Sequence, residues 1–366
     1  MDGIGSNLKR ARLLKGLSLN EAGKLMNMSA TAIAKYEKNE ITPDSTKIIL
    51  FSKAYGVSII ELLSIYEKPK MTFSSFRKRK RLKGEKLELL KELILRKVSK
   101  YLEVLKLSGL RKKIILNKYK INNLNEVNNI VNIFRKEMLG INELIPISDL
   151  TSILESLGIV IIYIEDKDNI FSDFDGLSEV VEGIPIIVLS DINDGARQRF
   201  TLAHELGHLL LDINEELDEE KVCNTFASSL LLPKLAMINE FGVYRVNINF
   251  YELEAIKNKY KVSYKAIVYR LKEIGVIKEY SFKNLNILLN KIIGSKDPNP
   301  LTTEKSYQFK KLVYRLESLE IIGVQKVIEL LEINIDEYNE ENYYNWYEHN
   351  YRFKWSECFA WIYNVR

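Results

Sequence analysis

The sequence predicts an α+β protein, in which an all-α head and a helical connector precede a small α+β domain and a helical C-terminal extension. Three observations predict this organisation. Residues 6–66 carry short amphipathic patterns separated by caps and turns. From Glu85 to Leu105, apolar residues recur three and four positions apart, which is typical of one long helix. Between residues 145 and 233, a helix pattern is followed by strand-like runs and two further helices.

The charge distribution changes along the chain and helps to place the boundaries. Residues 68–120 hold 19 basic and 4 acidic side chains, whereas residues 121–366 hold 26 basic and 38 acidic ones. A basic block favours a phosphate-rich partner, although a solvated, lysine-rich linker explains the composition equally well. We predict four parts: a head over 1–67, a basic helical connector over 68–135, an α+β domain over 136–280 and an extension over 281–366.

The composition argues against a membrane or secreted protein. No run of about 18 apolar residues is present, so we expect no membrane span. The N-terminus lacks the long apolar stretch of a signal peptide. Cys223 and Cys358 lie far apart and form no disulfide framework. We therefore expect a cytoplasmic protein.

The head shows a cap, helix, turn, cap and helix in succession. Ser18 and Glu21 form a capping box, and Ser29 caps a second helix over Ala30–Glu37. Asn39 stands where a helix end takes the left-handed conformation. A further helix begins at Pro43 and Asp44, and its expected apolar set is Ile48, Ile49, Phe51 and Ala54.

The stretch LSLNEAGKLMNMSATAIAKYEKNEITPD resembles the XRE family of repressor-type helix-turn-helix domains. The resemblance implies that residues 30–35 enter the DNA major groove. Small residues there offer few donors to base edges, and Leu19 replaces a polar residue frequent in the family, so we expect limited base-specific readout. A helical interaction module without DNA is the alternative. Such heads often bind as dimers, so we expect a homodimer. The expected DNA-binding residues are Ser29, Ala30, Thr31, Ala34, Lys35 and Lys38.

The connector carries a dense basic cluster at Arg77–Arg81, just before its long helix. Positive charge at a helix N-terminus opposes the helix dipole. The placement indicates an external anion such as DNA phosphate, and a charged flexible linker is the alternative.

The stretch FTLAHELGHLLL, residues 200–211, holds two of the three histidines, with Glu205 between them. At 3.6 residues per turn, His204 and His208 lie on one face, where two imidazoles can bind one metal ion. Glu205 lies displaced on the same side, where it can hold a water molecule, and Gly207 leaves room beside the pair. A leucine-rich core helix with two chance histidines is the alternative, but the opposite face carries the apolar set: Leu202, Ala203, Leu206, Leu209, Leu210 and Ile213.

A catalytic zinc ion needs a third protein ligand. Asn214 stands six residues after His208, so a third-histidine pattern is absent. In the next predicted helix, which begins near Asp218 and ends before Pro233, Glu220 is the expected third ligand. Asn224, one turn later, is expected to orient a ligand histidine, and Ala227 allows a close helix approach. Glu216 and Glu219 are rival ligands, and acidic residues at a helix start also need no function.

The stretch RQRFTLAHELGHLLL, with the later ExxxNxFASSLLLP, resembles the ImmA/IrrE family of zinc metallopeptidases. The ExxxN spacing is similar to the ExxxD of gluzincin peptidases, and the resemblance covers residues 75 to 280. It implies cleavage of XRE-type repressors, which derepresses mobile-element or stress genes. Zinc on the three ligands would polarise water and the scissile carbonyl, with Glu205 as the general base.

Several further expectations concern the surroundings of this site. The helix that precedes the strands is expected to be capped by Ser148, and residues 171–179 to form a turn between two strands. Ile186–Leu189 is expected as an edge strand that pairs with an extended substrate. Tyr264, Tyr269 and Arg270 are candidate oxyanion donors on a later helix, whose surface needs no function.

The C-terminal extension reads as two helices around Gly323 and an aromatic tail over residues 342–366. The tail fits core packing, a partner surface or a flap, and His349 is expected to be structural. The sequence thus predicts a zinc endopeptidase coupled to DNA binding, acting on a repressor-type protein or on itself. The alternative is a non-proteolytic, antitoxin-like XRE repressor, whose zinc domain is a sensor or a platform for a toxin-like partner. The presence of Glu205 favours the enzyme.

Overall fold

The computed structural model describes residues 3–64, 68–73, 84–110, 116–166, 170–191, 194–294, 297 and 299–341. The chain divides into two compact units, of which the first holds residues 1–67, 103–108 and 309–366 and the second holds 68–102 and 109–308. The cluster Arg77–Arg81, His349, Cys358 and the aromatic tail lie outside the described residues. Among the described residues, no helix is both long and apolar enough to cross a membrane.

The first unit begins with a five-helix head that matches the predicted pattern. Ser18 and Glu21 form the capping box, and the Ser29 hydroxyl accepts the N–H of Ala32 at the start of α3. Leu8, Ile33 and Phe51 are fully buried between the helices. The helices are α1 (Ile4–Leu14), α2 (Leu19–Met26), α3 (Ala30–Glu37), α4 (Ser45–Tyr55) and α5 (Ile59–Leu63).

Two contacts hold α1 against the end of α3. Asn39 has the predicted left-handed conformation, with φ 60°, and its side chain accepts the Gly5 N–H at 2.8 Å. A side chain at Gly5 would collide with the carbonyls of Tyr36 and Glu37, so glycine permits this close approach. The prediction that Ile49 belongs to the apolar face of α4 was wrong, since its side chain is 44% exposed. The core-facing side of α4 carries Phe51 and Tyr55 instead.

The first unit also contains the two predicted helices around Gly323. They are α16 (Gln308–Ser318) and α17 (Val324–Leu331), and Gly323 is the N-cap of α17. Their apolar faces form a small core with Val104, near the end of α7 (Glu85–Leu107). Lys326 adds an ion pair to Glu103 at 2.9 Å.

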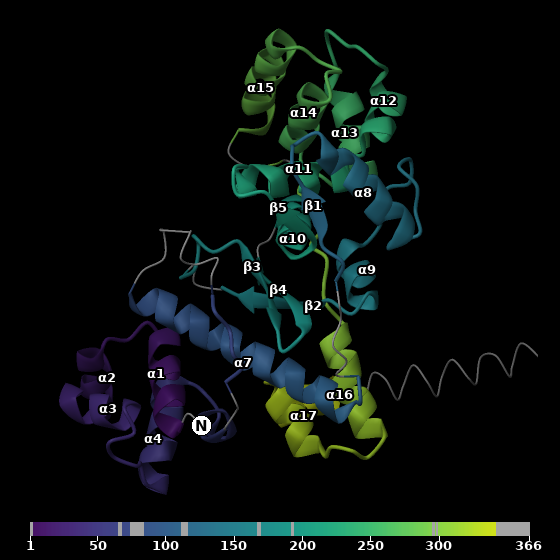
Figure 1. The fold of residues 1–366 in the computed structure, drawn as a ribbon. Helices are drawn as coiled ribbons and strands as arrows, with labels where there is room; N and C mark the ends of the chain where they lie inside the picture. Colours follow the sequence, from purple (N-terminus) through teal and green to yellow (C-terminus); the bar gives the residue numbers. More distant parts are fainter. Residues whose placement is uncertain are drawn as a thin grey trace, which may run out of the picture. The chain divides into compact units, whose positions relative to one another are not determined.

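The second unit contains a three-stranded sheet in the order β2–β4–β3 (Figure 1). The central strand β4 (Ile184–Asp191) runs parallel to β2 (Val160–Glu165) and antiparallel to β3 (Gly176–Val181). The prediction of an edge strand at Ile186–Leu189 was therefore wrong, since β4 is paired on both sides. The expected turn over 171–179 was also partly wrong, because residues 176–179 belong to β3.

A tight turn explains why β3 pairs with β4. Glu182 and Gly183 both have positive φ, 54° and 84°, as in the two-residue hairpin turns whose twist matches that of the strands. Val181 and Ile184 flank this turn as a register pair. The hairpin makes β3 an edge of this sheet.

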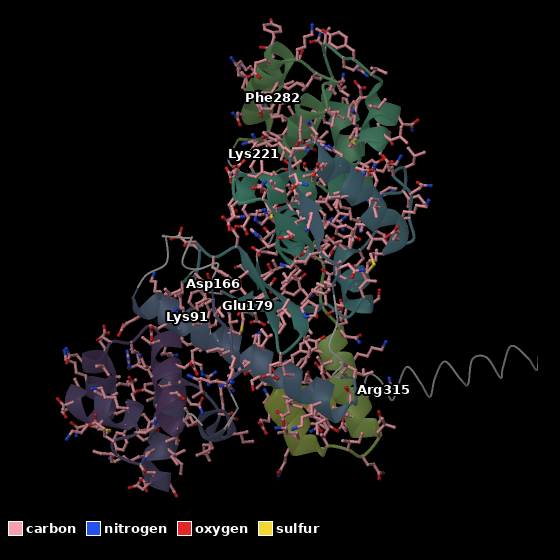
Figure 2. All side chains as sticks on the ribbon, in the orientation of Figure 1. Lys91, Asp166, Glu179, Lys221, Phe282 and Arg315 are labelled. Carbon is pink, nitrogen blue, oxygen red and sulfur yellow. The ribbon has the colours of Figure 1, made fainter. Side chains whose placement is uncertain are left out.

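The residues before α7 attach to β3. The N–H groups of Thr72 and Phe73 donate to the Glu179 carboxylate at 2.6 and 3.1 Å. Lys91 lies on α7 (Figure 2), and its ammonium group is 5.8 Å from the centre of the Phe73 ring. Lys97 donates to the Tyr163 carbonyl of β2 at 3.1 Å. These contacts join residues 68–102 to the sheet.

The histidine helix α10 (Gly195–Leu210) packs against the sheet and against α11 (Glu219–Leu231). Its leucine face is buried in the main core, as predicted, but Ile213 lies in strand β5 (Leu211–Ile213), which pairs parallel with β1 (Tyr119–Ile121). The other helices of this unit are α8 (Glu126–Glu137), α9 (Leu150–Ser156), α12 (Lys234–Phe241), α13 (Phe250–Tyr260), α14 (Tyr264–Glu273) and α15 (Glu279–Ile293).

Residues 301–306, here called the strap, bind the start of α10. Glu304 exchanges two hydrogen bonds with the Gln198 side chain, at 2.7 and 3.1 Å. Its carboxylate accepts from buried Arg199 and from the N–H groups of Leu150 and Thr151 in α9. Because the N–H groups of Leu150 and Thr151 donate to Glu304, the start of α9 depends on a residue 154 positions after Leu150. The cap of α9 is Asp149 and not Ser148, since Asp149 accepts the Ser152 N–H.

Candidate metal centre and nucleic-acid interface

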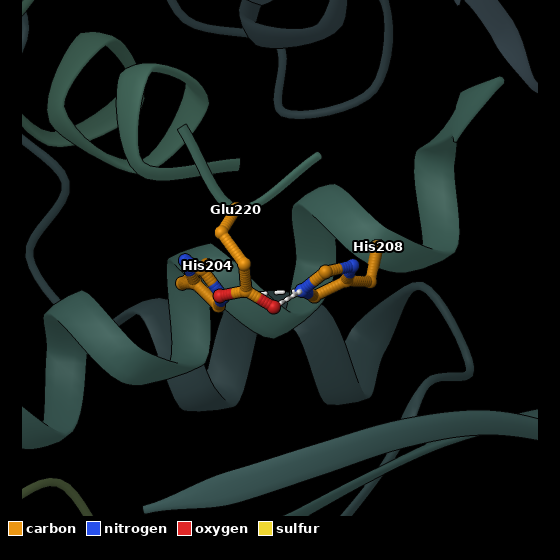
Figure 3. Close-up of side chains that lie close together, drawn as sticks. All are labelled: His204, His208 and Glu220. Carbon is orange, nitrogen blue, oxygen red and sulfur yellow. Dashed lines mark hydrogen bonds and ion pairs between the residues drawn. The ribbon is translucent and has the colours of Figure 1, made fainter. Parts of the chain in front are cut away.

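His204 and His208 of α10 and Glu220 of α11 bring their ligand atoms within 4.8 Å of one another (Figure 3). The two Nε2 atoms are 3.1 Å apart. The Glu220 carboxylate oxygens lie 3.3 Å from His204 Nε2 and 3.7 Å from His208 Nε2. Two ligand atoms, each about 2.0–2.1 Å from a tetrahedral zinc ion, are about 3.3 Å apart. Two imidazoles and a carboxylate at these spacings therefore fit zinc.

Each histidine is held at its other ring nitrogen. His204 Nδ1 donates to Asn224 Oδ1, and His208 Nδ1 donates to Glu219 Oε1, both at 3.0 Å. These acceptors place the proton on Nδ1, so each Nε2 lone pair points towards Glu220. Asn224 lies where its spacing to Glu220 predicts. Glu219, the first rival ligand, contacts Nδ1 of His208 and not the Nε2 side that faces Glu220. Glu216, the second rival, is not among the residues whose ligand atoms converge.

Glu205 lies under the edge strand of the sheet. It is 1% exposed, and the Ser178 hydroxyl of β3 donates to its Oε2 at 3.0 Å. Protein therefore covers Glu205 and most of His204, which is 7% exposed, whereas His208 is only half-buried. Ser178 was not predicted as part of the site, because its sequence context is typical of a turn. The two β-branched residues Val180 and Val181 were the available signal for a strand.

Close packing of two helices brings Glu220 to the histidines. A side chain at Gly207 would lie 3.3 Å from the Phe226 ring and 3.4 Å from Cys223 Sγ. Ala227 is fully buried beside the same core. The space left by Gly207 is thus filled by α11, and the small residues let the two helices approach.

The residues His204, His208 and Glu220 are called the metal group below. A cleft of about 890 Å³ adjoins this group at Glu220. Residues from the start of α10, from α11 and from α14 line it, including Glu220, Asn224 and Tyr269. Of the three candidate oxyanion donors, only Tyr269 is among the lining residues.

The other two candidates point into the protein. Tyr264 stacks on Phe250 at 5.0 Å, and burial raises the pKa of its phenol. Arg270 donates to the Leu232 carbonyl and to Glu273 and Asn128, and burial lowers the pKa of its guanidinium group. Arg270 thus holds α8, α11 and α14 together.

Helix α3 of the head, where the sequence predicts DNA contacts, presents an exposed face. Thr31, Lys35 and Lys38 are exposed, opposite buried Ile33. Ala30 and Ala34 are half-buried, and the exposed Ser29 uses its hydroxyl for the helix cap.

The two arginines of α1 are engaged inside the head. Arg12 donates to Glu37 at 2.6 and 3.0 Å, which ties α1 to α3. Arg10 pairs with Glu61 of α5 at 3.1 Å. The lysines of α3, and not these arginines, therefore supply positive charge at the exposed face.

The comparisons with known proteins match both resemblances. Residues 8–62 match the helix-turn-helix family model, and residues 154–272 match the model of the IrrE N-terminal-like domain. Among solved structures, the chain is similar to Bacillus thuringiensis PlcR in complex with the peptide PapR7 and DNA, at 13% identity and a TM-score of 0.17. The match covers 87% of this chain and 99% of that one. The comparison with curated proteins returned no match.

Proposed function

We propose that this chain, which joins a helix-turn-helix domain to an IrrE N-terminal-like domain, is a DNA-binding regulator with a zinc-dependent endopeptidase centre. The observation that carries the proposal is the convergence of His204, His208 and Glu220, with Glu205 next to the first ligand. Its substrate is a repressor-type protein or the chain itself, and cleavage derepresses mobile-element or stress genes. Such a regulator acts in the cytoplasm, where its DNA lies.

The proposed mechanism assigns each polar group near the metal group a task. Zinc, when bound, supplies a positive charge that polarises a water molecule and the scissile carbonyl. Glu205 takes the proton of the attacking water and delivers it to the leaving amine. The Ser178 hydroxyl donates to one carboxylate oxygen of Glu205 and thereby orients this proposed general base. Tyr269 is the proposed donor to the oxyanion, because it lines the adjoining cleft.

The proposed DNA interface is α3 with its cap. Thr31, Lys35 and Lys38 face the major groove and the flanking phosphates, while Ser29, Ala30 and Ala34 lie close to the DNA backbone and base edges. Two lysines supply charge, and few side chains read bases, which supports affinity more than sequence selection. We propose that the head binds as a homodimer.

The function is tested by co-expression with a helix-turn-helix repressor encoded nearby, under inducing conditions. Wild type is expected to cleave the repressor, and Glu205→Gln is expected not to, because an amide cannot accept the proton. Glu216→Gln, an exposed change outside the metal group, serves as the control and should cleave as wild type does. Immunoblots and mass spectrometry of the fragments provide the readout. Equal cleavage by wild type and Glu205→Gln, or none by wild type, would favour a sensor or partner platform.

A further inference from the structure

The cleft beside Glu220 has a defined chemical lining. On α11 it is lined by Lys221, Asn224 and Ser228, which recur at helical spacing on one face. Phe200 of α10 contributes an apolar surface. Further apolar surface comes from Leu124, Ala196, Val262, Ala266 and Tyr269. A peptide segment that enters this cleft therefore meets apolar side chains close to a metal ligand.

The acidic residues of the cleft are already engaged. Asp194 and Asp218 accept N–H groups at the starts of α10 and α11. Glu273 accepts from Arg270 and from Ser228. Glu220 belongs to the metal group. Each of these four carboxylates is thus held by a helix start, by an ion pair or by the proposed metal site, and the two aspartates lie at the positive ends of helix dipoles.

The basic residues of the cleft divide into two kinds. Arg197 donates to Asp175, and Lys272 pairs with Glu279 at 2.7 Å. For Lys221 and Lys265, the described part of the chain supplies no ion-pair partner, and both side chains are exposed. Lys221 follows the ligand Glu220 directly on α11 (Figure 2). Lys221 and Lys265 are therefore the cleft lysines whose ammonium groups can pair with a bound ligand.

We propose that this cleft takes a substrate segment in which an acidic side chain stands beside an apolar one, and that Lys221 and Lys265 select the acidic side chain. The inference rests on the proposed peptidase function for its biological meaning. The recognition itself depends on the charges and apolar residues of the cleft. An ion pair that is open to solvent changes affinity by about two- to fivefold, so two lysines together give on the order of tenfold.

Binding tests the recognition separately from catalysis. The full chain with Glu205→Gln is titrated with two fluorescein-labelled peptide libraries, identical except for a fixed Glu or Gln beside a fixed Leu. We expect tighter binding of the Glu library by on the order of tenfold. The double variant Lys221→Glu/Lys265→Glu should lose or reverse this preference. Lys234→Glu, an exposed change outside the cleft lining, should keep it.

Equal affinity for the two libraries, or a preference that the double variant retains, would overturn the inference. Wild-type protein with zinc, incubated with a proteome-derived peptide mixture, provides the second readout. Cleavage sites enriched in Asp or Glu beside an apolar residue support the inference, and cleavage without this enrichment contradicts it. Absence of any cleavage, together with a Glu preference in binding, contradicts the peptidase function and leaves the recognition supported.

Discussion

The orientation of the two histidine rings depends on two residues outside the proposed set of metal ligands. Asn224 fixes the ring of His204, and Glu219 fixes that of His208, each through Nδ1. Such outer contacts change metal affinity by about 10- to 100-fold when removed.

We therefore expect Asn224→Ala to weaken zinc binding by about 10- to 100-fold, measured by competition with a chromophoric chelator. Asn224→Asp should bind nearly as well as wild type, because an oxygen acceptor for His204 Nδ1 remains. Asn290→Ala, an exposed change on α15, should leave affinity unchanged. Wild-type affinity in Asn224→Ala would show that this contact does not orient the histidine.

At the scale of single residues, the spacing of side chains along one helix predicted part of the site. Glu220 and Asn224 are one helical turn apart, so their shared face followed from the sequence. The contact of Glu219 with His208 depends on the angle at which α11 crosses α10, which no local pattern specifies. The contact of Ser178 with Glu205 depends on strand pairing across the sheet. Helical periodicity therefore could not predict the contact of Glu219 with His208 or that of Ser178 with Glu205.

At the scale of elements, the strap binds the start of α10 through several polar contacts. Glu304 neutralises Arg199, which is 1% exposed, and caps the first N–H groups of α9. Breaking a buried ion pair by removing one partner costs about 3–5 kcal/mol.

We expect Glu304→Ala to lower the free energy of unfolding by about 3–5 kcal/mol, since it leaves the buried Arg199 charge without its carboxylate. Urea unfolding followed by circular dichroism measures the change. Glu215→Ala, an exposed acid in the loop before α11, should stay within about 0.5 kcal/mol of wild type. Equal stability of the two variants would mean that the strap contributes little.

Element types were easier to predict than their pairing. The caps of α2 and α3 and the long periodicity of α7 predicted these helices, because those signals are local. The central place of β4 in its sheet was not predicted, because an apolar strand has the same sequence pattern whether it pairs with one strand or with two. Strand β3 was missed because its glycine, serine and glutamate resemble a loop.

On the scale of the whole molecule, the helix-turn-helix head and the candidate metal site belong to different compact units. The four predicted parts, 1–67, 68–135, 136–280 and 281–366, stay a proposal. Residues 103–108 cluster with α16 and α17, more than 200 positions later. Periodicity predicts such helices individually, but their partners come from tertiary packing.

The DNA proposal predicts a specific salt dependence. Each lysine that contacts a phosphate adds about one to the slope of log affinity against log salt concentration. Lys35→Ala/Lys38→Ala should therefore weaken DNA binding and reduce this slope by about two. Lys53→Ala, on exposed α4 surface, should leave the slope unchanged. Fluorescence anisotropy with labelled duplexes at several salt concentrations gives the slopes, and an unchanged slope in the double variant would contradict the assigned contacts.

The most direct test of the metal centre is the zinc content of purified protein, measured by inductively coupled plasma mass spectrometry. We expect about one zinc ion per wild-type chain, as three protein ligands hold one ion. His204→Ala, His208→Ala and Glu220→Ala should each lose most of it, while Glu205→Gln should keep it. Unchanged zinc content in His204→Ala, or no zinc in wild type purified with zinc present, would contradict the proposed centre.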